Sequence, residues 1–324
     1  MSSNILSQAI RRATIAAAVG LFAAPAFAAA PMAGTPAPGY YRFMLGNFEI
    51  TALSDGTADL PVDQLLHEPA EKTLAALHAS FEKAPLQVSD NAYLINTGKR
   101  LVLVDTGAGD LFGPTLGKLM RNLEASGYQA EQVDDIFLTH MHPDHVGGLV
   151  RNHAIQFPNA VVHADRAEAD WWLSQKNLDD APEASRSFFQ GAMASVEPYV
   201  HAGKFSAFDG AVELVPGVRS YPSFGHTAGH TSYLIESAGK KLLLMGDLIH
   251  VPAVQFEHPE VTISFDSDPG EAAAARAKAF GQVARKRTLV AGAHLPFPGL
   301  GHLRASGTGY QWVPVDYGRM PDGQ

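Results

Sequence analysis

Four side chains that can bind a metal ion lie within six consecutive positions of this chain, 140–145. The stretch reads His-Met-His-Pro-Asp-His, and its potential ligands are His140, His142, Asp144 and His145. The apolar run before it, 136–138, is typical of a buried strand, and Pro143 suits the first turn of a helix. His140 and His142 are two positions apart, so both can point the same way from an extended chain. Imidazole and carboxylate suit zinc and similar ions, so this turn predicts a metal site.

The composition limits how a metal could be bound. The chain has 324 residues and no cysteine, which excludes disulfides and zinc–thiolate sites and leaves His, Asp and Glu as ligands. Hydrophobic residues make up 46% and charged residues 18%, as in a globular protein. This length can bury a core for one large domain or two small ones.

Residues 1–28 are predicted to be a cleavable signal peptide, so we expect a periplasmic or secreted protein. Arg11 and Arg12 precede an apolar run, 13–24, and the segment ends in Ala-Phe-Ala, a small-x-small cleavage site. The run is too short for a stable membrane anchor. An ordinary N-terminal helix is the alternative, and the paired arginines leave general and twin-arginine export both open. A flexible linker of Pro, Gly and Ala is expected over 29–39.

The charge balance restricts the partners. Loss of the signal peptide changes the formal net charge from −9 to −11, because its two charged residues are both arginines. An acidic chain with no basic run argues against nucleic acid and anionic membranes as partners. No later stretch is apolar and long enough for stable membrane insertion.

The apolar pattern predicts a single domain, 40–324, in which strands precede helices in each half. Hairpins are expected over 40–53, 91–105 and 232–245, and a turn is expected at 54–57. The expected helices cover 72–83, 116–123, 166–175, 187–200 and 269–284, and further strands are expected at 160–163 and, as the last strand, 288–294. Two mixed sheets packed face to face, with helices outside, would satisfy this order.

Three more candidate ligands, His226, Asp247 and His294, each come at the end of a predicted strand and close to a glycine. Glycine lets the backbone bend so that a side chain can approach a metal. Seven ligands are too many for one tetrahedral zinc ion but suit two metals that share a bridging carboxylate. Asp105, which ends another strand, either supports a metal-bound histidine or caps its own loop.

Together these motifs resemble the metallo-β-lactamase superfamily. The resemblance is carried by 140–145, by Gly-His-Thr-Ala-Gly-His at 225–230, by Gly246-Asp247 and by Ala293-His294. It implies an α+β fold, the αββα sandwich of two mixed sheets flanked by helices. The implied ligands of one metal are His140, His142 and His226, and those of the other are Asp144, His145 and His294, with Asp247 bridging. His230 would then support the ligands without binding metal.

Further segments are similar to methyl parathion hydrolases and their dihydrocoumarin-type lactonase relatives, which are exported dizinc hydrolases of aryl esters. These segments are 37–42, 49–56, 105–108, 111–116 and 293–299. The resemblance implies two divalent metal ions, with zinc as the leading expectation, and a homodimer. It also implies a substrate pocket lined by Phe112, Trp172, Phe188 and Phe265. Each of these aromatic residues could instead be core, and the adjacent Trp171 and Phe189 are expected to be core.

The chemistry expected of such a site is hydrolysis by a metal-bridging hydroxide that attacks a carbonyl carbon or phosphorus. Asp144 and Asp247 would be catalytic as metal ligands. No dedicated proton donor is evident among the motifs. A phenolate leaves without full protonation, because the pKa of a phenol is about 10, whereas an alkoxide needs more help. Aryl lactones and aryl esters are therefore the expected substrates.

His250 lies three positions after Asp247 and is expected at the mouth of the metal site. It could bind a lactone carbonyl or assist the leaving oxygen, and it would crowd a bulky triester. Phe265 is larger than the leucine expected in phosphotriesterases by the same resemblance. Both residues favour a lactonase or arylesterase with promiscuous organophosphate hydrolysis. The alternative for His250 is an ordinary loop histidine.

Other functions remain open on this fold, because a fold does not determine a function. The main alternative is a methyl-parathion-type phosphotriesterase, and the second is a diiron oxidoreductase. A metal-binding protein without catalysis is a further class. A glyoxalase-type thioesterase, an acyl-homoserine lactonase and a true β-lactamase fit less well, because the first and last need basic residues and the second releases an alkoxide. Zinc, cobalt and manganese all suit the ligands.

Overall fold

Two mixed seven-stranded sheets form the framework of the chain from Pro38 onward, in a computed structural model that describes residues 30–318. The predicted signal peptide lies outside the described residues. In spatial order, the first sheet contains β1 (Tyr40–Leu45), β2 (Phe48–Leu60), β3 (Leu86–Asn96), β4 (Leu101–Val104), β5 (Asp135–Phe137), β8 (Val161–Asp165) and β9 (Phe205–Phe208). The second contains β10 (Glu213–Val215), β11 (Val218–Pro222), β12 (Thr231–Ser237), β13 (Lys240–Leu244), β14 (Leu289–Ala291), β15 (Leu300–Ser306) and β16 (Gly309–Pro314). A separate pair is formed by β6 (Val150–Arg151) and β7 (Ala154–Ile155).

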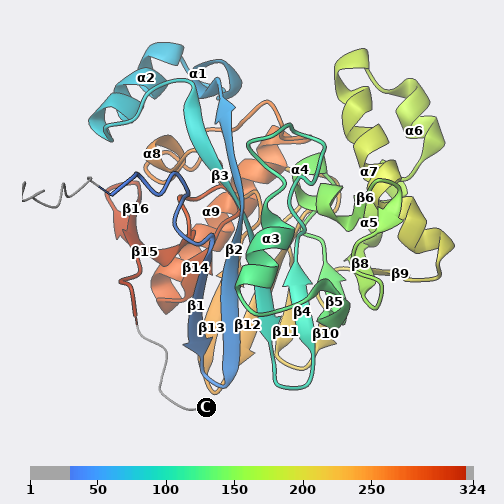
Figure 1. The fold of residues 1–324 in the computed structure, drawn as a ribbon. Helices are drawn as coiled ribbons and strands as arrows, with labels where there is room; N and C mark the ends of the chain where they lie inside the picture. The colour runs from blue at the N-terminus through green and yellow to red at the C-terminus, as the bar shows by residue number, and fades with distance from the viewer. Residues whose placement is uncertain (1–29, 319–324) are drawn as a thin grey trace, which may run out of the picture. The chain divides into compact units, whose positions relative to one another are not determined.

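Helices cover the outer face of each sheet (Figure 1). The α-helices of the described residues are α1 (Val62–Leu65), α2 (Ala70–Ala79), α3 (Leu119–Ala125), α4 (Pro143–Val146), α5 (Arg166–Trp172), α6 (Gln175–Asp180), α7 (Glu183–His201), α8 (Pro252–Gln255) and α9 (Pro269–Lys286). Side chains of α3, α5 and α7 pack against the first sheet, and those of α9 pack against the second. This αββα arrangement confirms the predicted fold class. Within the described residues, no helix has the length and apolarity that spanning a bilayer requires.

The apolar runs of β3 and β4 follow from burial of both faces of the first sheet. Leu94 and Leu103 point into the core between this sheet and its helices, while Ile95 and Val102 point into the core between the two sheets. Successive strand residues alternate between faces, so a sheet that is covered on both sides needs apolar residues at consecutive positions.

The turn predicted at 54–57 is wrong, because β2 continues through it. A register shift between Ser54 and Gly56 marks a bulge in the strand. The Asp55 carboxylate at this bulge accepts hydrogen bonds from the backbone N–H groups of Ala108, Gly117 and Leu119. Asp55 is a residue type common in turns, but here its carboxylate fixes the neighbouring loop, which carries Phe112.

The predicted ends of several elements also differ from the structure. The strand at 288–294 is not the last one, because β15 and β16 follow it, and their many exposed positions weaken the apolar signal. The helix predicted over 72–83 ends at Ala79, and fully exposed Phe81 beyond it has a φ of 60°. The helix predicted over 166–175 ends at Trp172, because Ser174 caps α6 by accepting the N–H of Asn177.

A buried hydrogen bond joins the two sheets beside the His-rich turn. Tyr233 of β12 is fully buried, and its hydroxyl donates to the carbonyl of Leu138 over 2.6 Å. The Tyr233 ring also stacks on Phe137 of β5 with a centroid distance of 5.5 Å. One residue later, the carbonyl of Thr139 accepts the N–H of Thr231 over 2.8 Å. The second sheet thus holds the start of the loop that carries His140.

We expect Tyr233→Phe to lower the free energy of unfolding by about 1–3 kcal/mol, because it leaves the buried Leu138 carbonyl without a donor. Urea denaturation of both proteins measures the change. Tyr41→Phe is the matched control, since it removes an exposed hydroxyl that bonds to Asp316 over 3.3 Å, and its effect should stay within about 0.5 kcal/mol. Equal effects of the two substitutions would contradict the importance of the bond between the sheets.

Candidate metal centre

The seven predicted ligands lie together at one edge of the two sheets. The strands β11, β13 and β14 run in the same direction, so their carboxyl ends meet at that edge. The loops and turns that follow these strands and β5 carry His226, Asp247, His294, His140, His142, Asp144 and His145. Pro143 opens α4 directly after the first two histidines, as predicted.

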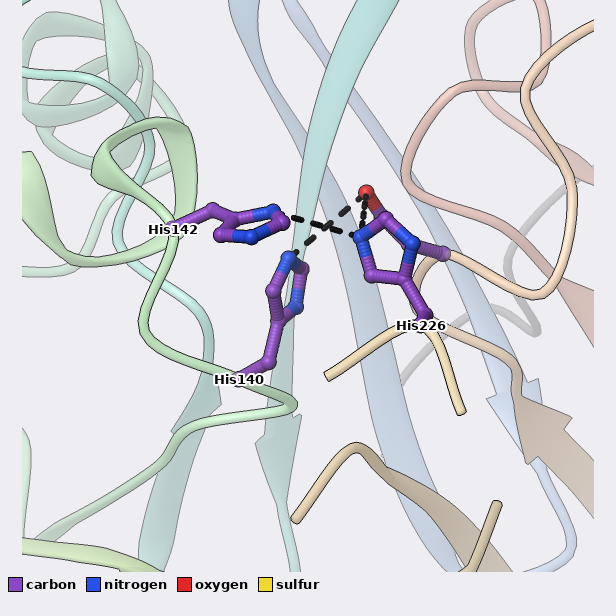
Figure 2. Close-up of side chains that lie close together, drawn as sticks. His140, His142 and His226 are labelled. Carbon is purple, nitrogen blue, oxygen red and sulfur yellow. Dashed lines mark hydrogen bonds and ion pairs between the residues drawn. The ribbon is translucent and has the colours of Figure 1, made fainter. Parts of the chain in front are cut away.

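One group contains three histidines and a carboxylate (Figure 2). The Nε2 atom of His226 lies 3.2 Å from Nδ1 of His142 and 3.4 Å from Oδ2 of Asp247. The Nε2 atom of His140 lies 3.7 Å from the same Asp247 oxygen. The three imidazoles converge on one point from two loops that are far apart in the sequence, as a tetrahedral metal site requires.

A second group contains Asp144, His145 and His294. The Nε2 atoms of His145 and His294 each lie 3.6 Å from Oδ2 of Asp144. The same two nitrogens approach Asp247, at 3.3 Å from Oδ1 and 3.0 Å from Oδ2 respectively. The Asp247 carboxylate therefore lies between the two groups, where it can bridge two ions.

Three buried polar atoms without hydrogen-bond partners fit two bound cations. His140 Nε2, His145 Nε2 and Asp247 Oδ1 are buried and have no hydrogen-bond partner. Buried polar atoms almost always have one, and these three point into the two ligand groups. Imidazole nitrogen and carboxylate oxygen are the ligands that zinc and similar divalent ions take in the absence of cysteine.

Burial and charged neighbours set the protonation states of the ligands. Burial lowers the pKa of His140 and His142 well below its usual range, and the nearby imidazoles lower it further. Burial alone would favour the neutral acid at Asp247, but the surrounding histidines, His145 foremost, hold the pKa of Asp247 well below its usual range. At His145, His226 and His294 burial also acts to lower the pKa, but the adjacent carboxylates outweigh it. They raise the pKa of His226 and His294 to about 9 and that of His145 well above its usual range. These three rings must therefore release a proton when a metal binds.

Two predicted supporting residues contact the ligand loops. Oδ2 of Asp105 lies 2.9 Å from Nδ1 of His145, and the same carboxylate accepts the backbone N–H and the hydroxyl of Thr139, each over 2.8 Å. His230 accepts the N–H of Asp247 at its Nε2 over 3.0 Å, while its Nδ1 lies 3.1 Å from the carbonyl of Ser223. Both nitrogens of His230 are engaged, which leaves neither for a metal.

Asp266 also supports the centre, although sequence reasoning missed it. Its Oδ1 lies 2.8 Å from Nδ1 of His226, and its Oδ2 lies 3.8 Å from the guanidinium of buried Arg276 on α9. A carboxylate on the remote nitrogen of a metal-bound histidine orients the ring and raises its basicity. No local motif marks Asp266, because its histidine lies 40 residues away.

Glu168 on α5 is a second missed residue, and it connects both ligand loops. Its Oε1 accepts the N–H of Met141, between His140 and His142, over 2.8 Å. Its Oε2 accepts the hydroxyl of Thr227 and the N–H of Gly229 over 2.6 Å and 2.8 Å. Glu168 is fully buried. This carboxylate therefore sets the separation of the two loops that supply the first ligand group.

An apolar cavity opens above the ligands. Its lining includes Leu60, Val88, Phe112, Leu116, Phe188 and Phe265 together with His142, Asp144, Asp247, His250 and His294. Three of the four predicted pocket aromatics are in this set. Trp172 is not, because it is 5% exposed and packs between Phe189 and the edge of His142. Phe189 is core as predicted, whereas the prediction of a core position for Trp171 is wrong, since it is 44% exposed.

His250 lies against the shared carboxylate. Its Nε2 is 3.1 Å from Oδ2 of Asp247, and its ring stacks on His294 at a centroid distance of 5.0 Å. Burial lowers the pKa of His250 to about 4. A neutral ring that donates from Nε2 to Asp247 has an unprotonated Nδ1, and this buried atom has no hydrogen-bond partner.

Comparisons with known proteins agree with this geometry. The model of the metallo-beta-lactamase superfamily matches residues 87–294. The solved structure of the hydrolase AbOPH of the beta lactamase superfamily is 37% identical, covers 88% of this chain and 100% of its own, and has a TM-score of 0.83. AidC, a dizinc quorum-quenching lactonase, is 29% identical, covers 87% of this chain and 99% of its own, and has a TM-score of 0.80.

Curated relatives match over shorter stretches. A beta-lactamase-like protein 2 homolog of Drosophila melanogaster is 28% identical over 49% of this chain, and a probable metallo-hydrolase of Mycobacterium bovis is 29% identical over 48%. The chain spans about half the length of these relatives, 46% and 56%. An N-acyl homoserine lactonase of a Bacillus species is 27% identical over 54% of this chain and 70% of its own length.

We expect Glu168→Gln to weaken zinc binding about 10–100-fold, because an amide cannot accept all three hydrogen bonds that join the ligand loops. Competition with a chromophoric chelator measures the affinity. Glu124→Gln on the exposed face of α3 is the matched control and should bind zinc as the wild type does. Unchanged zinc affinity of a folded Glu168→Gln protein would show that Glu168 does not position the ligands.

Proposed function

The chain belongs to the metallo-beta-lactamase superfamily, and from that premise we propose that it is a metal-dependent hydrolase of aryl lactones and aryl esters. Promiscuous hydrolysis of organophosphate triesters would be a side activity. The observation that carries the proposal is a cavity walled by Phe112, Phe188 and Phe265 that ends on two ligand groups sharing Asp247. An aryl ring can pack on these side chains while its ester group reaches the ligands.

Two divalent ions, when bound, supply Lewis acidity and lower the pKa of water toward neutrality. The residues of the chain supply the rest. His140, His142 and His226 would bind one ion, Asp144, His145 and His294 the other, and Asp247 both. The apolar walls exclude bulk water, which strengthens electrostatic interactions with the ester group. His250 narrows the cavity beside Asp247.

The relatives support a lactone substrate and zinc as the metal. AidC is named a dizinc lactonase, and its structure holds an acyl-homoserine product. The Bacillus relative is named an N-acyl homoserine lactonase. These names favour acyl-homoserine lactones as a second candidate substrate, although their leaving group is an alkoxide. Export, a homodimer and the identity of the metal remain predictions.

The test is a paired assay of the zinc-loaded protein without its signal peptide. We expect kcat/KM for dihydrocoumarin to exceed that for methyl paraoxon by orders of magnitude, because His250 and Phe265 leave little room for a triester. A tie, or a preference for the triester, would make the protein a phosphotriesterase. Turnover of neither substrate with metal bound would contradict the aryl-ester proposal. Bound iron with oxygen uptake would instead indicate the oxidoreductase alternative.

His250→Leu tests the pocket separately from the metals. The substitution removes a ring that contacts Asp247 and lies 6.0 Å from Phe265. We expect the ratio of lactone to triester hydrolysis to fall, because the widened cavity admits the triester. Metal content is measured on both proteins as the control. An unchanged ratio at equal metal content would refute the selectivity assigned to His250.

A further inference from the structure

One carboxyl group in the cavity belongs to neither ligand group. Asp90 of β3 lines the cavity together with Asp144, Asp247 and His250. Its side chain is buried, and its Oδ2 has no hydrogen-bond partner. A buried carboxyl oxygen without a donor is unfavourable as an anion, so this position suits a neutral acid with a proton to give.

The backbone on both sides of Asp90 is tied to the loop that carries His294. The carbonyl of Ser89 lies 2.9 Å from Nδ1 of His294. The N–H of Asn91 donates to the carbonyl of Ala293 over 2.9 Å, and the Asn91 amide donates to the carbonyl of Leu295 over 2.7 Å. These bonds hold Asp90 in a constant position relative to the second ligand group.

The neighbouring side chains act on the Asp90 carboxyl group in both directions. Burial raises the pKa of Asp90 well above its usual range, and the carboxylates of Asp55 and Asp144 raise it further. The imidazoles of His145 and His294 act in the opposite direction without reversing the shift. No lysine or arginine of the described residues forms an ion pair with Asp90.

The other polar groups of the cavity are less suited to donate a proton. Asp144, Asp247, His142 and His294 belong to the ligand groups. His250 directs Nε2 to Asp247, so its Nδ1 accepts rather than donates. The Ser89 hydroxyl is a far weaker acid than a carboxyl group. Among the lining residues, the carboxyl group of Asp90 remains as a source of a proton.

We propose that Asp90 is a further catalytic residue, the proton donor to the leaving oxygen, and that it extends the substrates to lactones with alkyl leaving groups. The proposal rests on the proposed hydrolase function. Oxygen of water adds to the lactone carbonyl carbon as its proton passes to solvent. The bond from that carbon to the ring oxygen then breaks, and the ring oxygen takes the proton of Asp90. The Asp90 carboxylate regains a proton from solvent, so one water is consumed per hydroxy acid formed.

The experiment compares zinc-loaded wild type and Asp90→Asn on δ-valerolactone and dihydrocoumarin. A general acid contributes about 10²–10⁴-fold, so kcat/KM for δ-valerolactone should fall about 100-fold or more. Dihydrocoumarin should lose less than about tenfold, because a phenolate needs little protonation. Bound zinc, measured on each protein, should stay unchanged. Equal losses on both substrates, or none on either, would overturn the proposal.

Two further measurements keep the outcomes separate. Asp135→Asn is the matched control, since Asp135 is equally buried but lies at the start of β5 and pairs with Arg100. Its ratio of the two activities should equal that of the wild type. If Asp90→Asn does not fold, turnover of the two lactones by the wild type decides between the outcomes. Turnover of dihydrocoumarin without δ-valerolactone would reject Asp90 as the donor and keep the hydrolase, whereas turnover of neither would reject the proposed function.

Discussion

The Asp247 carboxylate is the contact on which the candidate centre depends. It lies within 3.4 Å of a nitrogen of His226, His145 and His294, and so it touches both ligand groups at once. Burying so many titratable groups without water is strongly unfavourable unless each has a partner. The partnerless atoms His140 Nε2 and Asp247 Oδ1 indicate that cations complete this cluster.

Acidic residues from three separate elements hold the ligands in place. Asp105 follows β4, Glu168 lies on α5, and Asp266 precedes α9. Each is buried and forms hydrogen bonds with a ligand ring or its loop. Because these elements belong to both halves of the sandwich, the geometry of the centre depends on correct packing of the two sheets and not on any single loop.

The ligands set the class of chemistry, and the cavity sets what is hydrolysed. The names of curated relatives range from lactonase to ribonuclease, as expected where function resides in the site. In the proposed function the aromatic walls select an aryl group by shape, and His250 and Asp90 add two polar groups to the same cavity.

The sequence by itself determined the seven candidate ligands and the αββα order of elements. Each ligand belongs to a short motif at the end of an apolar strand, and such local spacing is visible without a structure. The bulge at Asp55, the strands β15 and β16, and the opposite placements of Trp171 and Trp172 were decided by packing, since the local pattern at each position suits two outcomes. Only the tertiary structure revealed Asp90, Glu168 and Asp266. An isolated acid carries no signal along the chain, and its protonation and its partner depend on burial among groups that lie tens to hundreds of residues away.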